Sequence, residues 1–151
     1  MFALLNRLEP LTYLLLRSAL GAILLTHGLP KLVGGGHGSM ADPMAASLRL
    51  IETVMELPFA PQLAFLVMLL ETAGALMLLL GIGTRLVAAL FSLEMLGICL
   101  ALGPTWAWID RGIEYPVLLG MLAIYIVARG AGRYSVDAWW SNRGRLPILI
   151  M

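Results

Sequence analysis

The chain has 151 residues, of which 60% are hydrophobic and 13% charged, and its formal net charge is +1. Soluble proteins carry about 25% charged residues, so this composition excludes an ordinary soluble domain and indicates an integral membrane protein. The near-zero net charge argues against a nucleic-acid partner. The one cysteine, Cys99, leaves no internal disulfide and no paired-thiol redox centre, and no cluster with metal-ligand spacing is present in the sequence.

The first apolar segment covers about residues 11–27, between Pro10 and a stretch that contains Gly28 and Pro30. Proline and glycine stop regular helices, so we expect this membrane span to end there. A secretory signal peptide is the alternative for an apolar segment at this position. Because Arg17 interrupts the apolar run and no small-x-small cleavage motif precedes a soluble domain, we favour a retained span.

The connection over residues 28–61 is too long for a plain turn and contains one patterned segment. Asp42 can cap a helix that has proline at its first position. Leu48, Ile51 and Met55 then recur on one face, and charged residues lie on another. We expect a short amphipathic helix on the outer membrane surface, and a lid packed on top of the bundle fits the same pattern.

Two further apolar segments, about residues 62–80 and 86–102, are separated by a short connection at 81–85. Its paired glycines release the chain from helix, so we expect two antiparallel neighbours that form a hairpin. A fourth segment covers about residues 113–128, and two tryptophans before it suit a membrane interface. The sequence therefore predicts an all-α membrane protein, a four-transmembrane-helix antiparallel bundle with a short amphipathic helix in its first outer loop. We expect one domain over residues 1–151.

Basic residues are distributed unequally between the two predicted sides of the membrane. The side that holds both termini carries six arginines and the other side three basic residues, namely Arg7, Arg85, Arg129, Arg133, Arg143 and Arg145 against Lys31, Arg49 and Arg111. Basic residues are enriched in cytoplasmic loops. We therefore predict a multi-pass protein of the bacterial inner (cytoplasmic) membrane with both termini in the cytoplasm.

Three ionisable residues, Arg17, Glu71 and Glu94, interrupt the apolar segments. A charge at the bilayer centre costs about 2.5–3.5 kcal/mol on insertion scales, so these side chains need partners or a polar cavity. A helix rises about 1.5 Å per residue, which puts both glutamates near the midplane and the long arginine side chain within reach. We expect one cluster in the middle of the membrane. Two carboxylates against one guanidinium leave a surplus, so one glutamate is expected to hold and exchange a proton.

A second polar set, His27, Lys31 and Glu114, falls near the outer ends of the first and fourth segments. We expect this set to form the mouth of the same cavity. The alternative is that the buried charges only fix helix order and register, with no ligand. We favour a functional cavity because intramembrane ionisable residues commonly mark ion, proton or substrate paths. His37, in a glycine-rich stretch, is expected to be a solvated loop residue, and Cys99 a packing residue.

Several short motifs stand in order along the chain. They are the first-span arginine followed by His27-Gly28 and Lys31, then Glu71, Gly81-Ile82-Gly83-Thr84-Arg85, Gly112-Ile113-Glu114 and Gly130-Ala131-Gly132-Arg133-Tyr134-Ser135-Val136-Asp137. Together, over residues 17–137, they resemble the DoxX family of small bacterial membrane proteins. The resemblance implies a four-helix membrane protein linked to quinones, sulfur-compound oxidation or redox defence, with partner proteins.

The leading hypothesis is an inner-membrane subunit of a quinone- or sulfur-compound-linked redox system that binds a small apolar ligand. Glu71 and Glu94 would exchange protons, Arg17 would hold the charge balance, and His27 or Glu114 would line the outer mouth. No intrinsic cofactor motif is visible, so a quinone is the expected ligand and electrons would come from soluble or membrane oxidoreductase subunits. Two alternatives stay open: a small proton-coupled transporter or permeability protein, acting as a homo-oligomer, and a non-catalytic membrane anchor for soluble oxidoreductases.

Overall fold

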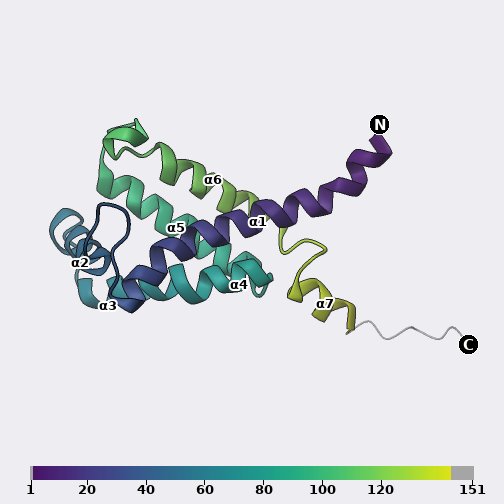
Figure 1. Cartoon of the computed structure of the whole chain (residues 1–151), viewed down its shortest axis with the longest axis horizontal. Helices are drawn as coiled ribbons and strands as arrows, with labels where there is room; N and C mark the ends of the chain where they lie inside the picture. Colours follow the sequence, from purple (N-terminus) through teal and green to yellow (C-terminus); the bar gives the residue numbers. More distant parts are fainter. Residues whose placement is uncertain (1, 144–151) are drawn as a thin grey trace, which may run out of the picture.

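The computed structural model describes residues 2–143, with side chains from residue 7 onward apart from that of residue 108. All elements of this part are helical (Figure 1). They are α1 (Phe2–Val33), α2 (Pro43–Arg49), the π-helical turn η1 (Leu50–Val54), α3 (Ala60–Leu69), the π-helical turn η2 (Leu70–Gly74), α4 (Ala75–Leu80), α5 (Thr84–Leu102), the 3₁₀ turn η3 (Trp108–Asp110), α6 (Glu114–Arg129) and α7 (Val136–Arg143). Arg145, one of the basic residues counted for the predicted orientation, lies outside the described residues.

Within residues 2–143, three helical stretches are long and apolar enough to cross a membrane: Arg7–Val33, Ala60–Leu80 and Thr84–Leu102. The second of these combines α3, η2 and α4. The fourth predicted span corresponds to α6, which has 16 residues and is shorter than the roughly 20 that a bilayer requires. Length and composition thus single out three spans.

An apolar face on α5 supports the membrane assignment. Leu86, Leu93 and Leu100 are spaced seven residues apart, so they share one face, and they are 68%, 65% and 72% exposed. A face of this kind is costly in water. The chain is therefore a helical membrane protein.

The first helix continues beyond the end predicted from the sequence. Gly28 and Pro30 lie within α1, which runs on to Val33, so the prediction that they end the helix is wrong. The last turns of α1 pack against η2, α2 and α3, and these contacts outweigh the low helix propensity of both residues. As a result Lys31 lies on the helix, one turn after Gly28, on the side that faces η2.

The long first connection folds onto the bundle. Asp42 caps α2 as predicted, since its carboxylate accepts a hydrogen bond of 2.9 Å from the Ala45 N–H. Behind it, Ile51 of η1 packs in a small apolar cluster with Ala60 and Ala64 of α3. The segment contacts the bundle through α1 and α3, as the lid alternative requires.

The predicted hairpin is confirmed between α4 and α5. Gly81 and Gly83 both adopt left-handed backbone conformations, with φ of 73° and 55°, and these allow the chain to reverse within a few residues. The helix α6 then packs along α5 (Figure 1). The core between the helices contains large, fully buried side chains such as Leu20, Leu78 and Phe91.

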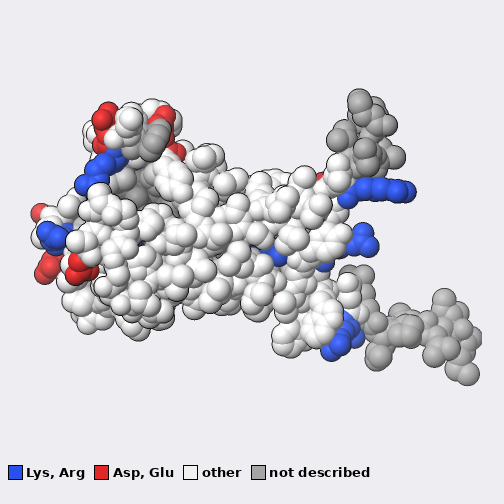
Figure 2. Space-filling view, viewed as in Figure 1, with Lys and Arg blue, Asp and Glu red and all other residues white. Residues whose placement is uncertain are grey.

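The charged side chains gather at the two ends of the molecule, and the belt between them shows few charges (Figure 2). We call the end with the 81–83 turn and α7 the terminal end, and the end with α2 and the 103–113 connection the loop end. The visible charges of the terminal end are almost all basic, whereas those of the loop end are of both signs (Figure 2). The belt between them is the part that would contact lipid.

Candidate functional site

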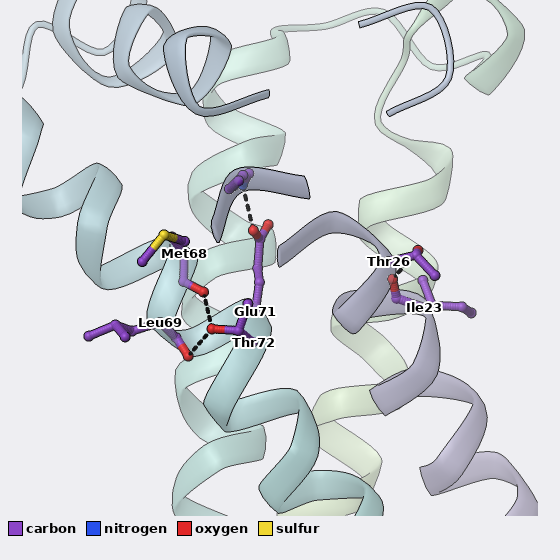
Figure 3. Close-up of polar contacts among 7 residues, drawn as sticks. Ile23, Thr26, Met68, Leu69, Glu71 and Thr72 are labelled. Carbon is purple, nitrogen blue, oxygen red and sulfur yellow. Dashed lines mark hydrogen bonds and ion pairs between the residues drawn. The ribbon is translucent and has the colours of Figure 1, made fainter. Parts of the chain in front are cut away.

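The centre of the candidate site is a buried ion pair between α1 and η2. The Lys31 Nζ lies 2.5 Å from the Glu71 Oε2, and the two side chains are only 9% and 6% exposed. Figure 3 shows the Glu71 carboxylate pointing away from its helix, with the dashed line marking this pair. Breaking such a buried pair is strongly destabilising, because a single charge would be left in low dielectric.

A second carboxyl group adjoins this pair. Glu94 of α5 lies within hydrogen-bonding reach of the Glu71 carboxyl and also interacts electrostatically with Lys31. Both Glu94 carboxyl oxygens are buried, and no group among the described residues donates a hydrogen bond to them. We refer to Lys31, Glu71 and Glu94 as the acid cluster. It contains two carboxyls and one ammonium, so it is electrically neutral when the two carboxyls share one proton.

The backbone around Glu71 departs from a regular α-helix. In η2 the hydrogen bonding widens to five residues, so the Ala75 N–H bonds the Leu70 carbonyl. The Thr72 hydroxyl donates to the carbonyls of Met68 at 2.7 Å and Leu69 at 3.3 Å, which satisfies groups at this irregularity (Figure 3). Single π turns within α-helices occur frequently at functional sites, where they reposition a side chain.

Gly28 brings α1 into direct contact with η2. A Cβ at this position would lie 2.5 Å from both the carbonyl carbon and the oxygen of Glu71, closer than two such atoms can approach. The absence of a side chain therefore lets the two backbones touch. This contact places Lys31, three residues further along α1, beside the Glu71 carboxylate.

Two histidines lie beside the acid cluster, where the loop after α1 folds back onto that helix. The rings of His27 and His37 have centroids 4.5 Å apart and are tilted by 52°. His27 interacts electrostatically with Glu71 and Lys31 as well as with His37. Both histidines are half-buried, and His37 lies in a partly exposed loop, as predicted, with its ring also packed on that of His27. The glycine-rich loop folds back and brings the ring of His37 onto α1.

The structure does not bring Arg17 into the acid cluster, and the predicted cluster of Arg17 with Glu71 and Glu94 is wrong. Arg17 and Lys31 are 14 positions apart on one helix, or about 21 Å along its axis. Arg17 is 1% exposed and donates to backbone carbonyls of Ala131, of Tyr134 at 2.8 Å and of Leu79 at 3.4 Å. Its role is to tie the segment before α7 to α1 and α4, and Lys31 takes the place that the prediction gave to arginine.

Asp137 completes this connection at the terminal end. Its carboxylate accepts hydrogen bonds from the N–H groups of Gly83, at 2.8 Å, and Thr84, at 3.0 Å, and so caps the start of α5. Burial raises the pKa of Asp137, but these backbone hydrogen bonds and the Arg17 charge outweigh it and hold the pKa below its ordinary value. Gly81 touches the same assembly, since a Cβ there would lie 2.4 Å from the Ser135 Cβ. The two glycine motifs around residues 81 and 132 are thus explained by packing.

The remaining predicted site residue, Glu114, lies at the loop end. It begins α6, and its backbone N–H donates to the Trp106 carbonyl at 3.1 Å. The structure brings together His27, Lys31, Glu71 and Glu94, so the two polar sets predicted separately are largely one. His37 was not predicted to belong to this set. Its position depends on how the loop folds, and the glycines of that loop do not indicate which way it folds.

Two further features bear on ligands. Within the described residues, no group of three or more His, Cys, Asp or Glu side chains could hold a metal ion. An open groove of about 590 Å³ lies at the loop end, away from the acid cluster, and is lined by residues that include Asp42, Arg49, Thr53 and Arg111.

This helical membrane protein with buried carboxyls was compared with known proteins. The DoxX family model matches residues 12–104, which is more than half of the chain. The chain therefore belongs to the DoxX family, as its motifs indicate. The comparison found no matching curated protein and no matching solved structure. The matched residues include all three members of the acid cluster.

Proposed function

We propose that this DoxX protein is a multi-pass protein of the bacterial inner membrane, with α6 as a fourth span of an antiparallel bundle and both termini in the cytoplasm. The basic terminal end supports this orientation, because arginine and lysine are enriched on the cytoplasmic side. The test replaces Cys99 by serine and adds one cysteine, at Ser39 or at Asn142. A membrane-impermeant thiol reagent applied to intact cells should label the first position and not the second. The reverse pattern would contradict the orientation.

Within this topology, the acid cluster is a proton-exchange site that serves a membrane redox system. The observation that carries the proposal is Glu94, a buried carboxyl beside the Lys31–Glu71 pair whose oxygens receive no hydrogen bond from the described residues. An unpaired carboxylate in this environment is costly, so sharing a proton with Glu71 is the stable arrangement. A site that holds one proton inside a membrane can give it to a ligand or accept it back.

A quinone fits the chemistry of this site. When bound, a quinone supplies two-electron chemistry that is coupled to two protons. Lys31 and the shared acid proton can donate hydrogen bonds to carbonyl oxygens, and the unbonded Glu94 oxygens can accept one from a hydroxyl group. The apolar surfaces of the helices suit an isoprenoid tail. Electrons would come from a soluble or membrane oxidoreductase subunit, since the sequence shows no haem, flavin or iron–sulfur motif.

The test is quinone binding to the purified protein in nanodiscs. We expect saturable binding of ubiquinone or menaquinone by the wild type, and at least roughly tenfold weaker binding by Glu94→Gln, which loses about one charged hydrogen bond. Glu52→Gln, at an exposed acid in η1, is the matched control and should bind as the wild type does. Equal binding by all three folded proteins, or none by the wild type, would contradict the proposal.

The terminal end favours a second role, as an anchor for a soluble oxidoreductase. Arg17 and Asp137 hold α7 against the bundle, and Trp139 and Trp140 of α7 are 53% and 70% exposed. The test is deletion of residues 138–151 and measurement of how much oxidoreductase activity stays with the membrane. If the protein is an anchor, the deletion should release this activity from the membrane and leave quinone binding unchanged. If the activity remains membrane-bound, the anchor role is wrong.

A further inference from the structure

Two histidines lie between the neighbourhood of the acid cluster and the loop that follows α1 at the loop end. His27 lies one turn before Lys31 on α1, and its charged neighbours among the described residues are His37, Glu71 and Lys31. The ring of His37 lies against that of His27, with centroids 4.5 Å apart and planes tilted by 52°. Both residues are partly exposed, so the pair joins the neighbourhood of Glu71 to the partly exposed loop over residues 34–42.

The loop that carries His37 is built to hold its ring at this position. The His37 N–H donates to the Met40 carbonyl at 2.8 Å, and the Met40 N–H donates back at 3.0 Å. Gly34 and Gly38 on either side have positive φ angles of 72° and 57°, and no atom lies within 4 Å of a Cβ built on either. These glycines are therefore required by the backbone conformation alone. Two glycines with positive φ thus allow the loop to return the chain to α1.

Among the described residues, the side of the bundle toward the terminal end shows no comparable pair of imidazole rings. Between the acid cluster and the terminal end the core contains fully buried apolar side chains, among them Leu20, Leu78 and Phe91. Arg17 beyond them is bonded to backbone carbonyls, and it holds a permanent positive charge that repels a hydrated proton. Proton exchange by the cluster is therefore expected from one side.

We propose that the His27–His37 pair is the proton route between the Glu71–Glu94 pair and the aqueous phase at the loop end. This inference rests on the proposed function of the acid cluster. Imidazole suits the task because one ring nitrogen accepts a proton while the other releases one. The proton leaves the carboxyl pair for His27, the proton on the other His27 nitrogen passes to His37, and His37 releases one to water. Both rings are then neutral again but in the opposite tautomer, and tautomer exchange restores the starting state without any movement of electrons.

The experiment measures how fast the carboxyl pair exchanges its proton. Protein in nanodiscs is subjected to a pH jump from a photolabile proton donor, and the carboxylic C=O stretching band is followed in the infrared. Glu71→Gln and Glu94→Gln identify the band. We expect His27→Phe and His37→Phe each to slow the response by at least roughly tenfold, since a positioned proton carrier contributes about 10²–10⁴-fold. Thr26→Val, an exposed neighbour on α1, is the control and should respond as the wild type does.

A chemical rescue separates proton transfer from a packing role. His37→Gly fits the glycine-rich loop, and added imidazole should restore a large part of its lost rate. If the rate is normal in both His→Phe variants, or if imidazole restores nothing, the route is wrong while the acid cluster stands. If the wild type has no carboxylic band that responds to Glu71→Gln or Glu94→Gln, the shared proton itself is absent, and the proposed function fails together with the route.

Discussion

Removing the positive charge of the acid cluster tests the buried pair most severely. Lys31→Met keeps the length of the side chain and deletes the ammonium that lies 2.5 Å from Glu71. Because both side chains are more than nine-tenths buried, no water replaces the lost partner. Breaking a buried pair in this way costs about 3–5 kcal/mol, or roughly two to four powers of ten in the unfolding equilibrium.

A second variant shows whether the loss comes from the unpaired charge. Lys31→Met combined with Glu71→Gln removes both charges, and replacing a whole buried pair by neutral groups is often nearly neutral. We expect the double variant to regain most of the stability that the single variant loses. Arg49→Met, at an exposed cation on α2, should change the free energy of unfolding by less than about 1 kcal/mol.

The assay is reversible unfolding in mixed micelles with increasing denaturing detergent, followed by tryptophan fluorescence. The reasoning is refuted if Lys31→Met costs no more than Arg49→Met, because the pair would then be solvated. It is also refuted if the double variant is as unstable as the single one, because the loss would then come from packing alone.

Three further changes test the geometry around the site and the terminal end by the same unfolding assay. Gly28→Ala forces α1 away from Glu71 and should cost about 1–3 kcal/mol, whereas Gly35→Ala, whose Cβ would meet its nearest atom at 3.6 Å, should cost little; equal losses would contradict the close contact. Arg17→Met leaves buried carbonyls without donors, so we expect a loss of at least about 2 kcal/mol and faster proteolysis between residues 130 and 143, and unchanged proteolysis would count against the tie. Asp137→Asn should be less stable than the wild type above pH 3.8, the ordinary pKa of this carboxyl. Because the folded pKa is lower, this difference should disappear as the pH falls through it, and a difference that persists in acid would refute the charge argument.

The sequence predicted an all-helical chain and three of its four apolar segments as membrane spans, because membrane spans are encoded in composition. The apolar segments, the hairpin at Gly81 and Gly83 and the Asp42 cap all follow from local chemistry. The estimated depth in the membrane was enough to place Glu71 and Glu94 in one layer.

The partner of the glutamates could not be predicted in the same way. Arg17 donates hydrogen bonds to backbone carbonyls before α7. Every residue has a backbone carbonyl, so the sequence does not indicate which ones will act as acceptors. Lys31 was assigned to an outer mouth because Gly28 and Pro30 suggested that the helix ends, and the packing of α1 on η2 overrode that local signal. The widened turn at Glu71 and the return of His37 to α1 are likewise set by tertiary contacts. The buried charged residues could be found from the sequence, but only the fold shows that Lys31, and not Arg17, is the cation beside Glu71 and Glu94.

The central claim is that Glu71 and Glu94 share one proton beside Lys31, and the number of protons on this pair at neutral pH tests it most directly. Infrared spectra of the protein in nanodiscs at pH 7 would be compared for the wild type, Glu71→Gln, Glu94→Gln and the control Glu52→Gln. We expect one protonated-carboxyl band in the wild type and in the control, and we expect this band to be lost or shifted in each cluster variant. A wild-type spectrum with no such band, or a band that both cluster variants leave unchanged, would contradict it.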